Sequence, residues 1–338
     1  MKNKLIRSKS PLRLGLAGGG TDVSPYADLY GGAILNATIN LYTYTTIEPT
    51  DNNEIVIESI DRNEKEALPV SACLEINDKL SLAKGVYNRI IKDFIKKPLA
   101  FKMTTYADAP AGSGLGTSSS MVVCILSAFA EWLNIPLGEY EMAHLAYEIE
   151  RNDLDIAGGR QDQYAATFGG VNFMEFYAGD KVIVNPLRIK TRYLSELENN
   201  LLLYYTSTSR LSSEIIEAQT RNVKEKNTKS IEAMHHLKEQ AQMMKEALLR
   251  GRVDEIGEIL DFGFRYKKQM ANSISNTSLD EIYETAKKAG STGGKISGAG
   301  GGGFMIFYCP ANTRYEVIKQ LQRLVASFRS LPVYGTMG

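Results

Sequence analysis

Hydrophobic and polar positions alternate over much of the first third of the chain, a pattern that predicts β-strands. Residues 33–48 and 54–60 are rich in β-branched and aromatic side chains with partial alternation, and residues 98–106 have the same character. PLRLGLA at 11–17 also predicts a short strand, whereas the apolar residues at 82–95 recur at helical spacing. We therefore expect a sheet and one helix in this third of the chain.

The pattern changes at Ser118, from which apolar residues recur at helical spacing to about Arg151. The segment from Asn134 to Gly138 interrupts this spacing and indicates the end of one helix and the start of another. Residues 171–177 and 181–187 return to a strand pattern.

The second half is dominated by helical patterns. After LLLYYTSTS, the chain from Ser212 to about Ala289 is almost entirely helical in pattern and ends at Gly290. A strand, a helix and a short last strand are predicted after it, at residues 304–308, 313–328 and 331–335. The whole pattern is that of an α+β protein.

A length of 338 residues, of which 43% are hydrophobic, suits a globular chain of two domains. No repeat, low-complexity segment or obvious linker marks their boundary. The change from mixed to helix-rich sequence lies near Asn185 to Tyr193, so we divide the chain into residues 1–188 and 189–338.

The charges balance, with 39 Lys plus Arg and 39 Asp plus Glu. This balance lacks the positive charge on which non-specific nucleic-acid binding depends, so we expect no nucleic-acid partner. The apolar run from Met121 to Ala130 is too short to span a bilayer, which needs about 20 apolar residues, so we expect no membrane association.

The compartment follows from the cysteines and the N-terminus. Three widely separated cysteines, one of them in the apolar run MVVCIL, suit a reducing cytoplasm. Arg7, Lys9 and Arg13 interrupt any apolar core of a signal peptide. We therefore expect a cytoplasmic protein.

The strongest local motif is PAGSGLGTSSS, from Pro110 to Ser120, which consists almost entirely of small residues and leads directly into an apolar helix. Such a loop lets backbone N–H groups converge on an anion at the positive end of the helix. A flexible surface turn is the alternative, but it rarely combines five hydroxyl groups with a buried helix start. The loop predicts a phosphate-binding site.

Other phosphate and metal motifs fail on inspection. Gly294-Lys295 is followed by Ile296 and therefore completes no Gly-x4-Gly-Lys-Ser/Thr motif, and no Gly-x-Gly-x-x-Gly with a ribose-binding acid is evident. Asp261-Phe262-Gly263 lacks the preceding His-Arg-Asp of protein kinases. The three histidines have no zinc-type spacing with cysteine.

Two further glycine clusters lie far from the phosphate loop in the sequence. Gly298 to Gly303 separates a helical pattern from a strand, and Gly18-Gly19-Gly20-Thr21-Asp22 follows the first predicted strand. Five glycines within six residues indicate close approach of backbones, since a plain turn needs only one or two. We expect distant segments to assemble into one site.

Phosphoryl transfer needs a cation on the phosphate charge, a metal bridge and a carboxylate aimed at the attacking hydroxyl. Asp162 in AGGRQDQYAATFGG, Glu150 at the end of a helix, Ser118 and Arg13 could supply these groups. Each of them alone is a weak signal, because a lone Asp or Glu is usually a solvated or capping residue.

Taken together, the motifs resemble those of the GHMP kinase superfamily, which includes galactokinase, homoserine kinase, mevalonate kinase and phosphomevalonate kinase. SPLRLGLAGGGTD resembles the first family motif, with Pro11, Arg13 and Asp22 in place. PAGSGLGTSSS resembles the ATP phosphate loop, and KISGAGGGGF resembles the third motif. The three occur in family order between residues 11 and 303, so the resemblance covers nearly the whole chain.

The resemblance implies an N-terminal domain like domain 2 of ribosomal protein S5, a ferredoxin-like C-terminal domain that carries the glycine-rich motif at 295–303, and a site in the cleft between them. It implies ATP and Mg²⁺ as cofactors, with Ser118 and Glu150 as metal ligands, and Asp162 and Arg13 as catalytic residues. The ATP-binding residues it implies are Pro110, Gly112, Gly114, Leu115, Gly116, Thr117, Ser118, Ser119 and Ser120. The substrate-binding residues it implies are Gly19, Gly20, Thr21, Asp22, Asp162, Gly300 and Gly301. A homodimer is compatible with the family.

The first motif differs from that of galactokinase, which has Gly-Glu-His-Thr-Asp where this chain has Gly-Gly-Gly-Thr-Asp. The missing side chains widen the expected sugar pocket. The glycine motif and GGRQDQYAATFGG are similar to kinases that act on D-glycero-D-manno-heptose 7-phosphate and to the kinase domain of L-fucokinases. Arg7, Lys9 and Arg160 are candidates to meet a substrate phosphate, although each is equally explained as a surface charge.

The resemblance therefore favours transfer of phosphate from ATP to the anomeric hydroxyl of this heptose phosphate. A sugar 1-kinase acting on fucose, galactose or a similar free sugar is the first alternative. A regulator that binds sugar and ATP without catalysis is the second, and Arg13, Glu150 and Asp162 argue against it. A structural or nucleic-acid-binding role is disfavoured by the zero net charge and the glycine loops.

Overall fold

The computed structural model describes residues 5–206, 212–271 and 273–326, which form two compact units that interleave along the chain. Unit 1 comprises the chain up to Arg13, Thr38–Ala111 and Gly116–Gly169, and unit 2 comprises Leu14–Ala37, Gly112–Leu115 and the chain from Gly170 onward. The division after residue 188 stays a prediction.

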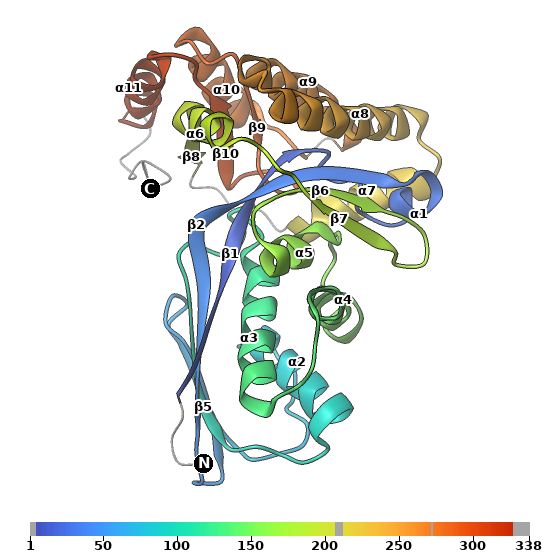
Figure 1. Ribbon diagram of the computed structural model, residues 1–338, viewed down its shortest axis with the longest axis vertical. Helices are drawn as coiled ribbons and strands as arrows, with labels where there is room; N and C mark the ends of the chain where they lie inside the picture. The colour runs from blue at the N-terminus through green and yellow to red at the C-terminus, as the bar shows by residue number, and fades with distance from the viewer. Residues whose placement is uncertain (1–4, 207–211, 272, 327–338) are drawn as a thin grey trace. The chain divides into compact units, whose positions relative to one another are not determined.

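The sheet of unit 1 is built on the second half of a long strand, β2 (Gly32–Pro49), which β1 (Ile6–Ala17) also pairs with (Figure 1). Next to β2 lies β5 (Phe101–Ala107) in antiparallel pairing, followed by β3 (Glu54–Ser59) in parallel pairing with β5. The edge strand is β4 (Glu64–Pro69), antiparallel to β3. The strands alternate between buried and exposed residues, as expected for a sheet with one face on a core.

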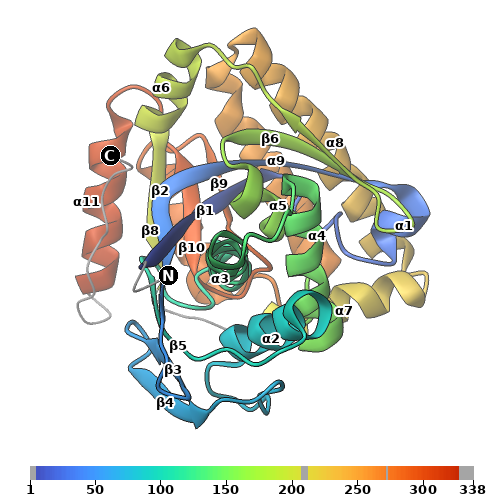
Figure 2. The same cartoon turned by 60° about the horizontal axis from the view of Figure 1, so that its bottom comes forward.

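The helices of unit 1 pack around α3, which Figure 2 shows nearly end-on. Apolar side chains surround α3 on most sides, as in a helix within a core. Two of the neighbouring helices continue as π-helical turns. The helical segments are α2 (Ser81–Ile90), η1 (Ile91–Ile95), α3 (Thr117–Leu133), α4 (Glu139–Glu148), η2 (Ile149–Asp153) and α5 (Gln161–Phe168). An aromatic cluster of Tyr87, Phe101, Phe129 and Trp132 fills the core between α2, α3 and β5.

Unit 2 contains two antiparallel arrays. The first half of β2 pairs with β6 (Val171–Phe176), which pairs with β7 (Val182–Pro186). A separate three-stranded sheet has β10 (Phe304–Tyr308) between β8 (Leu201–Tyr205) and β9 (Gly293–Ile296). The buried side chains of β10 and β9 join the apolar cluster under the helices of this unit.

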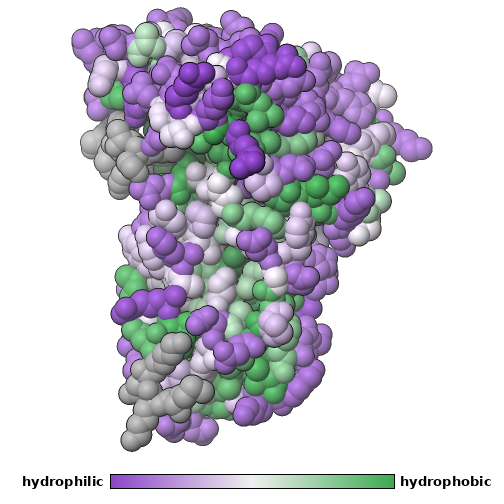
Figure 3. All heavy atoms as spheres, in the orientation of Figure 1, coloured by the Kyte–Doolittle hydropathy of each residue, from purple (hydrophilic) through white to green (hydrophobic). Residues whose placement is uncertain are grey.

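The helices of unit 2 are α1 (Tyr26–Tyr30), α6 (Thr191–Asn200), α7 (Ser212–Lys224), α8 (Thr228–Arg250), η3 (Val253–Glu255), α9 (Ile256–Met270), α10 (Thr277–Lys288) and α11 (Thr313–Ala326). Helices α8 and α9 lie side by side, and α9 also packs on β9 (Figure 1). Hydrophilic residues cover most of the visible face of α8 and α9 (Figure 3), as expected for amphipathic helices.

Most elements expected from the sequence are confirmed. The strands at 33–48, 54–60, 98–106, 171–177 and 304–308 are present, and the helical block after Ser212 consists of α7 to α10. The expected last strand at 331–335 lies outside the described residues. In the part of the chain that the structure describes, no helix is long and apolar enough to cross a bilayer.

Several elements were missed, among them β4, β9 and α6. β4 (EKEALP) is a charged edge strand, and such strands lack the apolar alternation of half-buried ones. The strand β9 begins with two glycines, which have low strand propensity and therefore gave no strand signal. Glycine is needed at position 294 because a Cβ there would lie 2.5 Å from the carbonyl oxygen of Ile306. α6 begins at Thr191, within the segment from Asn185 to Tyr193 where we placed the domain boundary.

The turn after β1 depends on the backbone of Gly18. This residue has φ +78°, and a Cβ on it would lie 1.9 Å from the carbonyl oxygen of Ala33 in β2. The hydroxyl of Thr21 donates within the same turn, 2.8 Å from the Gly18 oxygen, and the Ala33 N–H donates to this hydroxyl at 3.0 Å. The turn is therefore locked against β2 in a conformation that favours glycine.

We expect Gly18→Ala to lower the free energy of unfolding by roughly 2 kcal/mol or more, because the methyl group adds a backbone clash to a left-handed conformation. The matched control is Gly19→Ala, since Gly19 has no positive φ and its Cβ would make only ordinary contacts. Chemical denaturation of both variants measures the difference. Equal stability of the two would contradict the assigned turn.

Candidate functional site

The phosphate loop connects β5 to α3, and its glycines adopt backbone conformations with positive φ. Gly112, Gly114 and Gly116 have φ between +75° and +79°, and α3 begins at Thr117 directly after Gly116. The first backbone N–H groups of a helix lack partners within the helix and carry its positive dipole end. The loop therefore has the local geometry that the sequence predicts for anion binding.

The hydroxyl groups of this loop have different environments. Ser118 is exposed and lines a cavity in unit 1, whereas Ser119 is buried and accepts a hydrogen bond from the Gln163 side-chain amide at 3.1 Å. The buried Ser120 hydroxyl contacts the carbonyl oxygens of Ser10 and Pro11, each at 3.1 Å. The backbone N–H of Ser120 donates to the Gly116 oxygen within the first turn of α3. Of these three hydroxyls, that of Ser118 has the most accessible environment.

The cavity beside Ser118 is partly apolar and lies at the start of α3. It is lined by Ser59, Asp61, Arg62, Leu80, Leu82, Ala83, Thr105, Ala107, Ala111, Thr117, Ser118, Met121 and Ile125. The cavity therefore has apolar side chains next to the first turn of α3.

Arg13 and Asp162 meet beside the phosphate loop, as the resemblance implies. The Arg13 Nε lies 2.6 Å from Asp162 Oδ1, with the two side chains 5% and 24% exposed. A Cβ at Gly116 would lie 3.2 Å from the carboxyl carbon of Asp162. Unit 1 therefore brings together a buried cation, a partly exposed carboxylate and the last glycine before α3.

Glu150 is buried in η2, and its carboxylate accepts a hydrogen bond from the Gln163 side-chain amide. Burial raises the pKa of Glu150, an effect opposed by the nearby Arg151 charge and by hydrogen bonds from Ser119 and Gln163. The Arg151 Nη1 lies 3.8 Å from Glu150 Oε1. A buried carboxylate with such surroundings is stabilised as an anion when a cation binds beside it.

Several supporting residues were missed by sequence reasoning. Arg151 donates to the carbonyl oxygens of Ile156 and Gly159, each at 3.0 Å, and so fixes the loop between Glu150 and Asp162. A Cβ at Gly158 would lie 2.3 Å from Arg151 Nη2. The glycine pair Gly158-Gly159 was the available signal, because small residues in a loop often make room for a neighbouring side chain.

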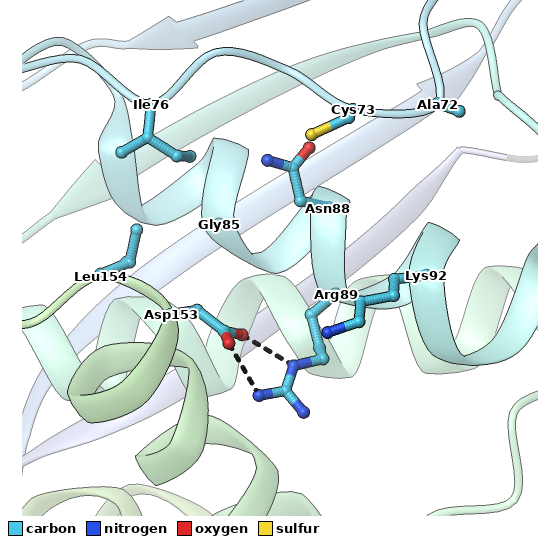
Figure 4. A pocket seen from close by; sticks show the side chains of 9 residues that line it. All are labelled: Ala72, Cys73, Ile76, Gly85, Asn88, Arg89, Lys92, Asp153 and Leu154. Atoms are coloured by element: carbon cyan, nitrogen blue, oxygen red, sulfur yellow. Dashed lines mark hydrogen bonds and ion pairs between the residues drawn. The ribbon is translucent and has the colours of Figure 1, made fainter.

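Arg89 holds the other end of η2. Its Nε and Nη2 lie 2.7 and 2.9 Å from the two carboxylate oxygens of Asp153, a bidentate pair seen beside a cavity of unit 1 (Figure 4). Its Nη1 lies 3.3 Å from Glu148 at the end of α4. These contacts join α2 to the segment that carries Glu150.

In unit 2, the loop at 112–115 packs directly on the third motif. The Ser297 hydroxyl donates to the Gly114 oxygen at 2.7 Å, and the Phe304 N–H donates to the Ser113 oxygen at 2.9 Å. A Cβ at Gly114 would lie 2.6 Å from the Ser297 oxygen, and one at Gly298 would lie 2.7 Å from Gly114 Cα. Close backbone approach, as expected from the glycine clusters, is confirmed for these two segments.

The glycine motif at 18–22 also lies in unit 2, near two buried lysines. Lys267 donates to the Gly298 oxygen at 2.5 Å, and Lys295 donates to the Gly15 oxygen at 2.6 Å. Both lysine Nζ atoms lie within 4 Å of the point where a Gly19 Cβ would stand. Segments of all three sequence motifs therefore meet within this unit.

The remaining predicted site residues have these positions. Pro110 is exposed, Leu115 is buried, and Thr21 and Asp22 are both buried. Gly20 faces the end of the Met270 side chain. Gly300 packs against Ile274, and the Gly301 N–H donates to the Ile274 oxygen at 2.9 Å.

The donor set of Ser118 and Glu150 fits magnesium, which prefers oxygen ligands. Over residues 5–206, 212–271 and 273–326 there is no group of three or more His, Cys, Asp or Glu side chains that could hold a metal. Magnesium is commonly held by one or two carboxylates together with substrate phosphates, so a hydroxyl and a single carboxylate are suitable ligand types, and the assignment stays a prediction.

The chain matches two models that describe the two parts of a GHMP kinase. The N-terminal domain model of GHMP kinases matches residues 81–170, and the C-terminal model matches residues 244–327. The first match contains the phosphate loop, Glu150 and Asp162, and the second contains the third motif.

Individual proteins give the same result. The chain is 51% identical to D-glycero-alpha-D-manno-heptose 7-phosphate kinase of Campylobacter jejuni, over 95% of this chain and 94% of that one. A crystal structure of a D-glycero-D-manno-heptose 1-phosphate kinase from Bacteriodes thetaiotaomicron has a TM-score of 0.80 and 50% identity, covering 95% and 93% of the two chains. Galactokinase of Lactococcus lactis, at 18% identity and a TM-score of 0.76, shares the fold over 96% of this chain and 91% of that one. The chain belongs to the GHMP kinases, with the two-domain α+β fold of that family.

Proposed function

We propose that this kinase transfers the γ-phosphoryl group of ATP to the anomeric hydroxyl of D-glycero-D-manno-heptose 7-phosphate. The product is the 1,7-bisphosphate, a precursor for nucleotide-activated heptose and surface polysaccharide. The observation that supports the proposal most is the Arg13–Asp162 pair beside Gly116, because it puts a carboxylate and a cation next to the phosphate loop. The Campylobacter jejuni relative, named for this substrate, supports the choice of sugar.

The nucleotide is assigned to unit 1. Its phosphates would bind the N-terminal turn of α3, and its base would occupy the cavity lined by Met121 and Ile125. Ser118 and Glu150 would hold Mg²⁺, which when bound neutralises charge on the phosphates. The proposed compartment is the cytoplasm, in keeping with the three unpaired cysteine thiols.

The acceptor hydroxyl is assigned to Asp162 of unit 1, and the glycine motif at 18–22 stays a predicted substrate-binding segment of unit 2. The Asp162 carboxylate would accept a hydrogen bond from the anomeric hydroxyl and orient it for attack on the γ-phosphorus. Arg13 would stabilise negative charge on the transferred group. An anomeric hydroxyl is more acidic than an ordinary alcohol. Asp162 therefore needs to orient this hydroxyl but does not need to be a strong base.

A free-sugar 1-kinase is the second candidate, and the observation in its favour is the galactokinase fold. We expect ADP release with heptose 7-phosphate to exceed that with heptose, L-fucose or galactose. A steady-state panel of these acceptors measures kcat/KM for each. A clear preference for an unphosphorylated sugar would contradict the proposed substrate.

We expect Asp162→Asn to reduce kcat by roughly 100-fold or more, because the amide cannot accept the proton or orient the hydroxyl as a carboxylate does. ATP affinity, measured by calorimetry, should change little. The matched control is Asp155→Asn in the loop before Asp162. A variant with most of its activity retained would remove Asp162 from the mechanism.

Glu150→Gln tests the buried carboxylate. Because burial raises the pKa of Glu150, the fold favours its protonated form, and ionisation destabilises the fold as pH rises above the ordinary value of 4.5. Without divalent cations, the variant should therefore melt at a higher temperature than the parent at about pH 8, with the difference vanishing near pH 4. Its magnesium-dependent activity should fall.

The opposite result for Glu150→Gln would be a lower melting temperature at about pH 8 together with unchanged magnesium dependence. That result would mean that the Glu150 charge stabilises the fold through its neighbours. It would also remove this residue from the proposed metal site.

A further inference from the structure

The buried side chain of Gln163 joins Glu150 to the first turn of α3 within unit 1. Its Nε2 donates to the Ser119 hydroxyl at 3.1 Å and to the Glu150 carboxylate. Gln163, Ser119 and Glu150 are 0%, 4% and 1% exposed, and they belong to α5, α3 and η2. One amide group therefore connects three segments that are separate in the sequence.

An ionised Glu150 determines which end of the Gln163 amide faces it. A carboxylate only accepts hydrogen bonds, so the amide nitrogen, and not the amide oxygen, has to point toward it. The two N–H donors of this nitrogen are used by Glu150 and Ser119, whereas Oε1 accepts no hydrogen bond from the described residues. The Gln163 side chain therefore acts as a donor toward the buried carboxylate.

Ser119 completes the hydrogen bonding around Glu150. Because the Ser119 oxygen accepts from Gln163, its own proton can point to the Glu150 carboxylate, with which Ser119 is hydrogen-bonded. The Ser119 hydroxyl is thus engaged inside the protein, whereas the neighbouring Ser118 is exposed. The two successive serines have different roles: Ser118 can meet a ligand, and Ser119 holds Glu150.

Neutral donors hold the Glu150 carboxylate without offsetting its charge. Gln163 and Ser119 are both uncharged, and the Arg151 Nη1 lies 3.8 Å from Glu150 Oε1, which is longer than a hydrogen bond. Both Nη atoms of Arg151 donate to backbone carbonyl oxygens of the following loop. A carboxylate held in this way keeps negative charge for a bound cation, which a close ion pair would reduce.

The same turn of α5 carries the residue assigned to the acceptor hydroxyl. Asp162 directly precedes Gln163, and its carboxylate pairs with Arg13 and lies beside Gly116. Two successive residues therefore fix α5 in unit 1, one beside the last glycine of the phosphate loop and the other at the buried carboxylate of η2.

We propose that Gln163 is a positioning residue of the magnesium site, which orients the Glu150 carboxylate directly and through Ser119. This inference rests on the proposed function, which assigns Mg²⁺ to Ser118 and Glu150. Groups that hydrogen bond to a metal ligand fix its orientation, and their loss typically lowers metal affinity by about 10- to 100-fold. Gln163 needs no contact with nucleotide or sugar for this role.

The test measures how much Mg²⁺ adds to nucleotide binding. Calorimetry gives the Kd of a non-hydrolysable ATP analogue without and with Mg²⁺, and the first Kd divided by the second is the magnesium ratio. Weaker contact between metal and protein lowers this ratio, whereas a general loss of structure raises both Kd values alike. No sugar is added, so the result does not depend on which sugar is the acceptor.

Gln163→Leu removes both amide donors at similar side-chain size and should lower the magnesium ratio by ~10-fold or more. Ser119→Ala, a smaller change, should lower it in the same direction and decides the matter if Gln163→Leu does not fold. The matched controls are Thr167→Val on α5 and Ser127→Ala on α3. Each loses one hydrogen bond to a carbonyl oxygen of its own helix and should leave the ratio unchanged.

A double-mutant cycle tests whether Gln163 acts through Glu150. Glu150→Gln alone should lower the magnesium ratio. Adding Gln163→Leu to this variant should lower the ratio little further, because the carboxylate that Gln163 orients is gone. Full, additive losses in the double variant would contradict an action through Glu150.

The outcomes separate the two proposals. An unchanged ratio in Glu150→Gln would remove Glu150 from the metal site, and the metal assignment in the proposed function would fail. A lowered ratio in Glu150→Gln, together with an unchanged ratio in the folded Gln163 or Ser119 variants, would keep that assignment and overturn the role of Gln163.

Discussion

The ion pair between Arg13 and Asp162 is the contact on which the chemistry of unit 1 depends. It joins residues 149 positions apart in the sequence, and the arginine is almost completely buried. A buried guanidinium without its carboxylate is strongly destabilising, so the pair fixes the start of α5 against β1. Gly116 then brings the phosphate loop within contact of the same carboxyl group.

In unit 2, glycines let backbone segments that are distant in the sequence pack directly against one another. Gly114 touches Ser297 and Gly298, and Gly18 lies against Ala33, at distances that no Cβ could occupy. These contacts leave few side chains near the motifs, and the long side chains of Lys267 and Lys295 reach into this region from α9 and β9. Small residues thus allow these segments to come into close contact, and two buried lysines donate to their carbonyl oxygens.

The sequence predicted what depends on local pattern. β2 and β3 are β-branched and alternate, and α3 is apolar after a glycine loop, so each was expected near its observed bounds. β9 was missed because its glycines serve contacts with α9 and β10 that no local pattern contains.

Long-range contacts of the site were harder to predict. The pairing of Arg13 with Asp162 came only from family resemblance, since nothing local relates residues so far apart. Lys267 lies in a charge-interleaved helix and resembles a surface residue, and Lys295 drew attention only as the lysine of a failed phosphate motif. Lys267 and Lys295 are buried, whereas Arg7 and Lys9 are exposed, and this difference cannot be read from the sequence.

The central claim is that phosphate is transferred to the anomeric oxygen of a sugar that already carries a phosphate. Phosphorus NMR of the reaction product, formed from ATP and heptose 7-phosphate, tests this claim most directly. The account predicts two phosphomonoester signals, of which the new one is coupled to the anomeric proton. A new signal coupled to any other sugar proton, or ADP formation without a new sugar phosphate, would contradict it.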